Sequence, residues 1–122
     1  ANPRFAPAAN NLAYILAEGN RALNDALKFA QTAKEQMPDD PSVMDTLGWV
    51  YFQKGLYDSA IGEFRASLGK APDNPTVIYH LARAYAKKGE TDKARAEAER
   101  ALKLNPTFTN AEDARKLLAE LK

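Results

Sequence analysis

The chain has 122 residues, of which 45% are hydrophobic and 27% charged, and its formal net charge is +1 at pH 7. This length and composition indicate one globular domain, and the near-neutral charge argues against a nucleic acid or an anionic membrane surface as the partner. The absence of cysteine excludes disulfides and thiolate metal sites. No transmembrane or export-signal pattern is visible, so the localisation stays unknown. Because the first residue is Ala1 rather than Met, we interpret the chain as an excised or processed piece.

The chain matches itself when it is shifted by 34 residues. After a lead-in of residues 1–6, three units are predicted at about 7–40, 41–74 and 75–108, the first being the most degenerate. A repeat of this length predicts stacked pairs of helices, none of which can bury its apolar face alone. Positions that agree between the second and third units include Pro41 and Pro75, Leu47 and Leu81, Tyr51 and Tyr85, Gly55 and Gly89, Ala60 and Ala94, and Pro72 and Pro106.

In chain order, the first unit is expected to contain helices at about 8–18 and 24–36, and the second unit a helix at about 42–54 and another after Asp58. The third unit should repeat this pair, and a capping helix at about 110–121 should cover its end, for seven helices in all. Prolines end the second helix of each unit. Small oxygen-bearing side chains at Asn24, Asp58 and Asp92 are predicted to cap those helices, and Thr109 with Glu112 has the spacing of a capping box.

These repeated positions resemble the tetratricopeptide repeat (TPR) family. The resemblance implies an all-α fold, an α-solenoid of antiparallel helix pairs, in which the first helices line a concave groove that holds an extended peptide or a helix of a partner protein. The second unit carries the family's marker residues as Leu47, Gly48, Tyr51, Ala60, Phe64 and Pro72, and the third as Leu81, Ala82, Tyr85, Ala94, Ala98, Ala101 and Pro106.

The helix at 42–54 is apolar nearly all round, which is typical of a helix that is buried or covered by a partner. Trp49 and Phe52 lie off its packing stripe, so we interpret them as groove residues; packing against neighbouring units is the alternative. Some members of the family bind chaperone tails with a carboxylate clamp of lysine, asparagine and arginine. Only Arg83 could take part in such a clamp here, so we do not predict one. The predicted partner-binding groove consists of Asn11, Ile15, Asp45, Trp49, Phe52, Tyr79, Arg83 and Lys87.

No catalytic, metal or cofactor site is predicted. His80 is the only histidine, so a role in helix packing or at the surface is favoured over a pH-sensing or ligand role. There is no phosphate-binding glycine motif and no nucleophile with a candidate base. We therefore expect a non-catalytic scaffold that binds another protein, with no nucleic acid and no direct membrane insertion. The alternative is a structural or self-assembling C-terminal fragment of a longer repeat protein, with no ligand site of its own, by analogy with the repeat arrays of bacterial secretion and envelope systems.

Overall fold

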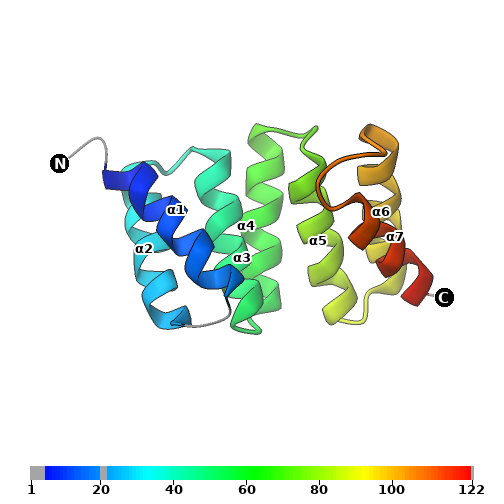
Figure 1. The fold of residues 1–122 in the computed structure, drawn as a ribbon, viewed down its shortest axis with the longest axis horizontal. Coiled ribbons are helices and arrows are strands. Elements are labelled where there is room, and N and C mark those ends of the chain that lie inside the picture. Colours follow the sequence, from blue (N-terminus) through cyan, green and yellow to red (C-terminus); the bar gives the residue numbers. More distant parts are fainter. Residues whose placement is uncertain (1–4, 20–21, 122) are drawn as a thin grey trace.

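The computed structural model describes residues 5–19 and 22–121. Within these ranges the chain is entirely α-helical, with seven helices and no strand, which confirms the predicted all-α fold. Figure 1 shows the helices following one another along the long axis, with α1 at one end and α7 at the other. Their bounds are α1 (Phe5–Glu18), α2 (Leu23–Gln36), α3 (Pro41–Gln53), α4 (Tyr57–Lys70), α5 (Pro75–Lys87), α6 (Thr91–Leu104) and α7 (Ala111–Glu120).

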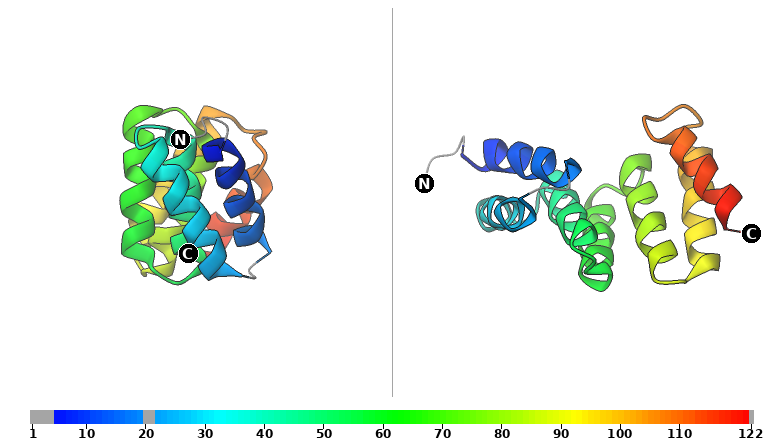
Figure 2. Two further views of the ribbon diagram at one scale, coloured as in Figure 1. Left: turned by 90° about the vertical axis from the view of Figure 1, so that its left-hand side faces the viewer. Right: turned by 60° about the horizontal axis from the view of Figure 1, so that its bottom comes forward.

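The helices are arranged in two layers. α1 packs on α2, α3 on α4 and α5 on α6, and successive pairs are joined by the packing of α2 on α3 and of α4 on α5. The first helices of the pairs also contact one another, α1 with α3 and α3 with α5, and so form one side of the molecule. The end-on view in Figure 2 shows α1 on the opposite side from α4. α7 packs against α6 and closes the stack.

Small residues allow the helices of a pair to approach closely. Ala26, Ala60 and Ala94 are all fully buried. A Cβ atom added to Gly48 of α3 would lie 2.6 Å from Cε1 of Phe64 in α4, so only glycine fits at this marker position without movement of the ring. The glycines inside α4 differ, because nothing lies within 4 Å of a Cβ built at Gly62 or Gly69. Close packing between helices therefore does not require glycine at either position.

The side chains that cap helices are not those predicted at Asn24, Asp58 and Asp92. Asp40 Oδ1 accepts hydrogen bonds from the backbone N–H groups of Ser42 and Val43 at 2.8 and 3.3 Å, and Asn74 caps α5 in the same way. The predicted caps stand at the second residue of their helices instead, and the residues that precede these helices make no side-chain cap bond. A carboxylate in the first turn still interacts favourably with the helix dipole. The predicted capping box before α7 is likewise not formed.

The turns within the second and third pairs are equivalent. Gly55 and Gly89 both have φ of 81°, and the N–H of the following residue donates to the carbonyl of Tyr51 or Tyr85. The first pair differs, because α2 is preceded by Ala22, a non-glycine residue with φ of 50°. α1 also begins at Phe5, before the predicted start at residue 8. None of the helices described is long and apolar enough to cross a bilayer.

Candidate functional site

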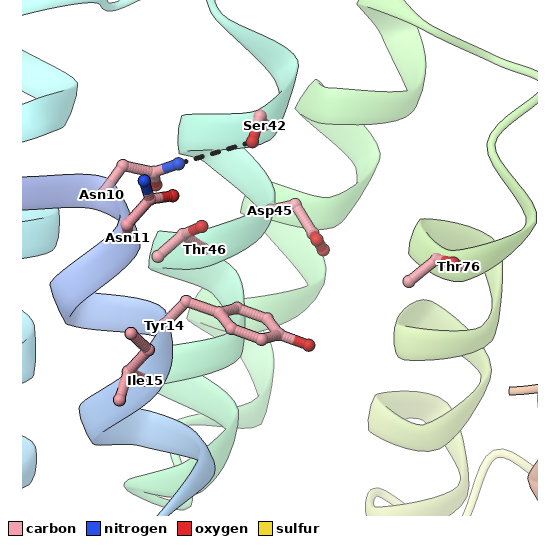
Figure 3. Close-up of a pocket in the computed structure, with 8 residues that line it drawn as sticks. All are labelled: Asn10, Asn11, Tyr14, Ile15, Ser42, Asp45, Thr46 and Thr76. Carbon is pink, nitrogen blue, oxygen red and sulfur yellow. Dashed lines mark hydrogen bonds between the residues drawn. The ribbon is translucent and has the colours of Figure 1, made fainter. Parts of the chain in front are cut away.

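An open cleft lies on the side of the molecule formed by α1, α3 and α5, with a volume of about 470 Å³. Figure 3 shows its side chains pointing from these three helices into the space between them. Most of the lining residues are polar but uncharged and so can form hydrogen bonds, although the surface they expose in the cleft is more apolar than polar. The residues that line this inner cleft are Asn10, Asn11, Tyr14, Ile15, Ser42, Asp45, Thr46 and Thr76.

Helical spacing explains why α1 presents its polar residues together. Asn10 and Tyr14 are four residues apart and therefore share one face of the helix. Asn10 Nδ2 donates to Ser42 Oγ at 3.4 Å, which ties α1 to α3 at one end of the cleft. Burial, followed by the nearby carboxylate of Glu18, raises the pKa of Tyr14 to about 12. The Tyr14 hydroxyl is thus neutral at physiological pH and can donate or accept a hydrogen bond.

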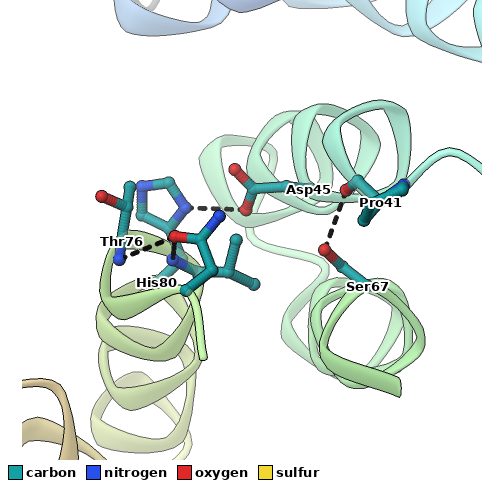
Figure 4. A network of polar contacts seen from close by, with 7 residues as sticks. Pro41, Asp45, Ser67, Thr76 and His80 are labelled. Atoms are coloured by element: carbon teal, nitrogen blue, oxygen red, sulfur yellow. Dashed lines mark hydrogen bonds and ion pairs between the residues drawn. The ribbon is translucent and has the colours of Figure 1, made fainter. Parts of the chain in front are cut away.

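Asp45 links the inner cleft to the interior. Its Oδ1 lies 2.8 Å from Nδ1 of His80, which joins α3 to α5 (Figure 4). An ionised carboxylate can only accept, so the imidazole donates its Nδ1–H in this bond. His80 is only 2% exposed. This contact gives His80 a structural role between two units, as the packing interpretation predicts.

A closed aromatic cluster lies beside the inner cleft, formed by Trp49, Phe52, Tyr57, Tyr79 and His80 together with Arg83. Trp49 stacks on Phe52 with ring centroids 5.0 Å apart and on His80 at 4.4 Å. The Arg83 guanidinium lies 5.7 Å from the centre of the Trp49 ring and 5.1 Å from that of Phe52. Trp49 and Phe52 are each only 5% exposed, so the surplus apolar surface expected from the sequence is covered by the chain's own side chains.

The predicted groove residues thus fall into two groups and one outlier. Asn11, Ile15 and Asp45 line the inner cleft. The aromatic cluster contains four others, namely Trp49, Phe52, Tyr79 and Arg83. Tyr79 and Arg83 also line a hollow of about 220 Å³ beside α7. Lys87 is exposed at the end of α5 and lines neither. Whether any of these residues contacts a partner stays a prediction.

Sequence reasoning missed five residues of the inner cleft. The four-residue spacing of Asn10 and Tyr14 was a usable signal for α1. Thr46 and Thr76 gave none, because a lone hydroxyl residue on a helix is as compatible with packing as with binding. The missed residues are Asn10, Tyr14, Ser42, Thr46 and Thr76. Within the ranges that the structure covers, no group of three or more histidines and carboxylates has the arrangement of a metal site.

Comparison with known proteins identifies the repeat. Residues 51–121 match the family model of the tetratricopeptide repeat. A TPR repeat-containing protein of Pseudomonas aeruginosa is 32% identical over 66 residues, which are 54% of this chain and 11% of that protein. The chain therefore spans only a small part of this bacterial relative's length. Its source agrees with the bacterial setting anticipated from the sequence.

Solved structures with the same fold cover nearly the whole chain. The type III secretion chaperone SycD of Yersinia enterocolitica, in complex with a peptide of the translocator YopD, superimposes with a TM-score of 0.83 at 19% identity, over 98% of this chain and 94% of that one. The first TPR of Spaghetti, bound to an HSP90 peptide, gives a TM-score of 0.82 at 15% identity, over 99% and 96% of the two chains. At these identities the likeness shows a shared fold.

Proposed function

Because this chain belongs to the tetratricopeptide repeat family, we propose that it is a non-catalytic protein-binding module whose inner cleft holds an extended segment of a partner protein. TPR proteins and the similar solved structures are chaperones and peptide-binding domains, which supports protein–protein interaction in general. The finer assignment to the inner cleft rests on the residues of this chain.

One atom carries that assignment. Asn10 lines the inner cleft, and its Oδ1 atom is buried and has no hydrogen-bond partner among the residues that the structure describes. A buried acceptor left unsatisfied costs about 1–3 kcal/mol, so a rotation of the Asn10 side chain that brings Oδ1 to a donor in the inner cleft would be stabilising. The backbone N–H of an extended peptide is such a donor. Asparagine can also donate to a peptide carbonyl, so Asn10 and Asn11 can bind a backbone of any sequence.

An exposed apolar side chain supports the same site. Ile15 lies in the inner cleft and is 65% exposed, and Leu12 on the same helix is 40% exposed. Apolar side chains among uncharged hydrogen-bonding groups are the usual lining of a peptide or ligand site. The inner cleft therefore offers both backbone hydrogen bonds and an apolar contact for one side chain of the partner.

Selection from a displayed library of random 12-residue peptides tests this proposal. The double variant Asn11→Ala/Ile15→Ser changes two exposed cleft residues, so the fold should be retained. The control Gln31→Ala/Leu104→Ser changes two exposed residues outside the inner cleft. We expect the selected peptides to bind the control like the native chain and the cleft variant at least about tenfold more weakly. Peptides that bind both variants equally would contradict the inner cleft as the site.

Self-association is the second candidate function, favoured by the burial of Trp49 and Phe52 and by the exposed Leu12 and Ile15 on α1. In this case the α1 surface would pack against another copy of the chain. Sedimentation of the native chain and of Ile15→Ser distinguishes the two functions. A concentration-dependent dimer that the substitution abolishes would support self-association, whereas a monomer at all concentrations would exclude it.

A further inference from the structure

We infer that the inner cleft selects partner segments that carry a lysine or arginine side chain, which pairs with Asp45. This inference rests on the proposed function, since it names the chemistry of the segment that the inner cleft would hold. It differs from recognition of an acidic peptide, because the charges available in the inner cleft are negative.

The distribution of charge along the inner layer supports a cationic ligand. Glu18 is the only charged residue of α1 and Asp45 the only charged residue of α3. Neither helix has a lysine or arginine, and none lines the inner cleft. The hollow beside α7 contrasts with this, because Arg83 and Lys116 there face Asp113 and Glu120. Among the residues that line the inner cleft, the one charged side chain is therefore the carboxylate of Asp45.

The geometry of Asp45 leaves it ready to accept a further bond. The bond to His80 occupies Oδ1, and the hydrogen bonds found among the described residues leave Oδ2 available. A carboxylate has about four acceptor positions, so a ligand cation can bind without displacing His80. The Asp45 side chain is 14% exposed, so it is reachable but partly shielded from water. A charge-assisted bond is stronger in such a setting than on an open surface.

His80 holds this carboxylate in place. Its ring is buried between Trp49, at 4.4 Å between centroids, and Phe64, at 5.6 Å. A side chain fixed before the ligand arrives loses little conformational entropy on binding, which raises affinity. We regard His80 as a positioning residue, because it acts through Asp45.

Tyr14 adds a second feature suited to a cation. The carboxylates of Glu18 and Asp45 contribute, after burial, to the raised pKa of its hydroxyl, which indicates a negative potential at this point of the inner cleft. Its ring is also an aromatic face beside Asp45 (Figure 3). The same layer already contains a cation packed on aromatic rings, because the Arg83 guanidinium lies over the rings of Trp49, Phe52 and Tyr79. Such cation–π contacts strengthen the binding of lysine and arginine.

The library selection described above also tests the inference. We expect every peptide whose binding depends on the inner cleft to contain lysine or arginine at a shared position. The strongest binder is then synthesised with that residue and with glutamine in its place, and the affinities of both peptides are measured at low and high salt. Replacement by glutamine should weaken binding to the native chain about tenfold, with most of the difference lost at high salt.

Asp45→Asn is the matching change in the protein, because asparagine keeps an acceptor for His80 and removes only the charge. It should weaken the lysine or arginine peptide about tenfold and leave the glutamine peptide unaffected. Glu99→Gln, an exposed carboxylate of α6, is the control and should change neither affinity. Circular dichroism confirms that each variant is folded, and the peptide substitution tests the pairing in the native chain should Asp45→Asn fail to fold.

The possible results distinguish the inference about a lysine or arginine ligand from the proposed function of the inner cleft. Two results would overturn the inference and leave the proposed function standing. One is a set of cleft-dependent peptides without a shared lysine or arginine. The other is a folded Asp45→Asn variant that binds the cationic peptide as the native chain does. A selection without any cleft-dependent peptide would overturn both.

Discussion

The inner cleft and the aromatic cluster lie side by side on the same layer of helices, yet one is open and the other closed. In the aromatic cluster, Arg83 from α5 reaches over the rings of Trp49 and Phe52 and occupies the place that a cation from a partner could take. In the inner cleft, Asp45 and Tyr14 have no lysine or arginine among the lining residues. The chain thus covers the rings of the aromatic cluster with its own cation, whereas the cation site proposed for the inner cleft has no such group among its lining residues.

This difference teaches that residue type alone does not identify a binding surface. Tryptophan, tyrosine and arginine are enriched at energetic centres of interfaces, but they are equally effective in holding neighbouring helices together. What distinguishes the two regions is the next unit along the chain. α5 supplies His80 and Arg83 to cover the rings of α3, whereas nothing equivalent from α3 covers Ile15 of α1.

The largest expected effect comes from Trp49→Ala. Because Trp49 packs between Phe52 and His80, its removal leaves a cavity and should lower the free energy of unfolding by about 3–5 kcal/mol. The exposed Ile15 of the inner cleft is the control, and Ile15→Ala should change stability by less than about 0.5 kcal/mol. Urea unfolding followed by circular dichroism measures both. Equal effects of the two substitutions would show that the aromatic cluster is no more closed than the inner cleft.

A smaller effect is expected from Arg83→Ala, which would open the aromatic cluster. Loss of its cation–π contacts should lower the free energy of unfolding by about 1 kcal/mol. Trp49 is the only tryptophan, so its fluorescence reports on the cluster directly. We expect red-shifted emission and faster quenching by acrylamide than in the native chain. Arg65→Ala, at an exposed position of α4, is the control, and identical quenching in the two variants would refute a covering role for Arg83.

The smallest expected effect is an alkaline loss of stability from Tyr14. Its pKa is raised from 10.0 to about 12 by burial, by Glu18 and by Asp45, so the folded state favours the neutral phenol. The stabilisation that this gives is complete below pH 10 and is lost as the pH rises towards 12. Urea unfolding at pH 9 and pH 11, as test conditions, should therefore show a smaller decline for Tyr14→Phe than for the native chain. An equal decline would place Tyr14 in a less negative environment than the inner cleft described here.

The sequence predicted the site less completely than the fold. The match between Pro41–Gln53 and Pro75–Lys87 was enough to predict helix pairs, because apolar spacing, prolines and turn glycines are local signals. The capping side chains were assigned to the wrong positions, since Asp58 and Asp92 are the second residues of their helices and stand two positions after the residue that precedes each helix. A shift of two residues changes a cap into a first-turn carboxylate, and no local signal distinguishes the two.

The sequence by itself determined a stack of TPR-type helix pairs and the small residues at their contacts, because the period and the need to bury one face of each helix leave few other arrangements. Only the tertiary structure decided which polar and aromatic residues remain open. Trp49 is covered by Arg83, 34 positions further along, and Asp45 is held by His80 at a similar separation. Such contacts between units depend on how one pair of helices is placed against the next, which the pattern within a single helix does not encode.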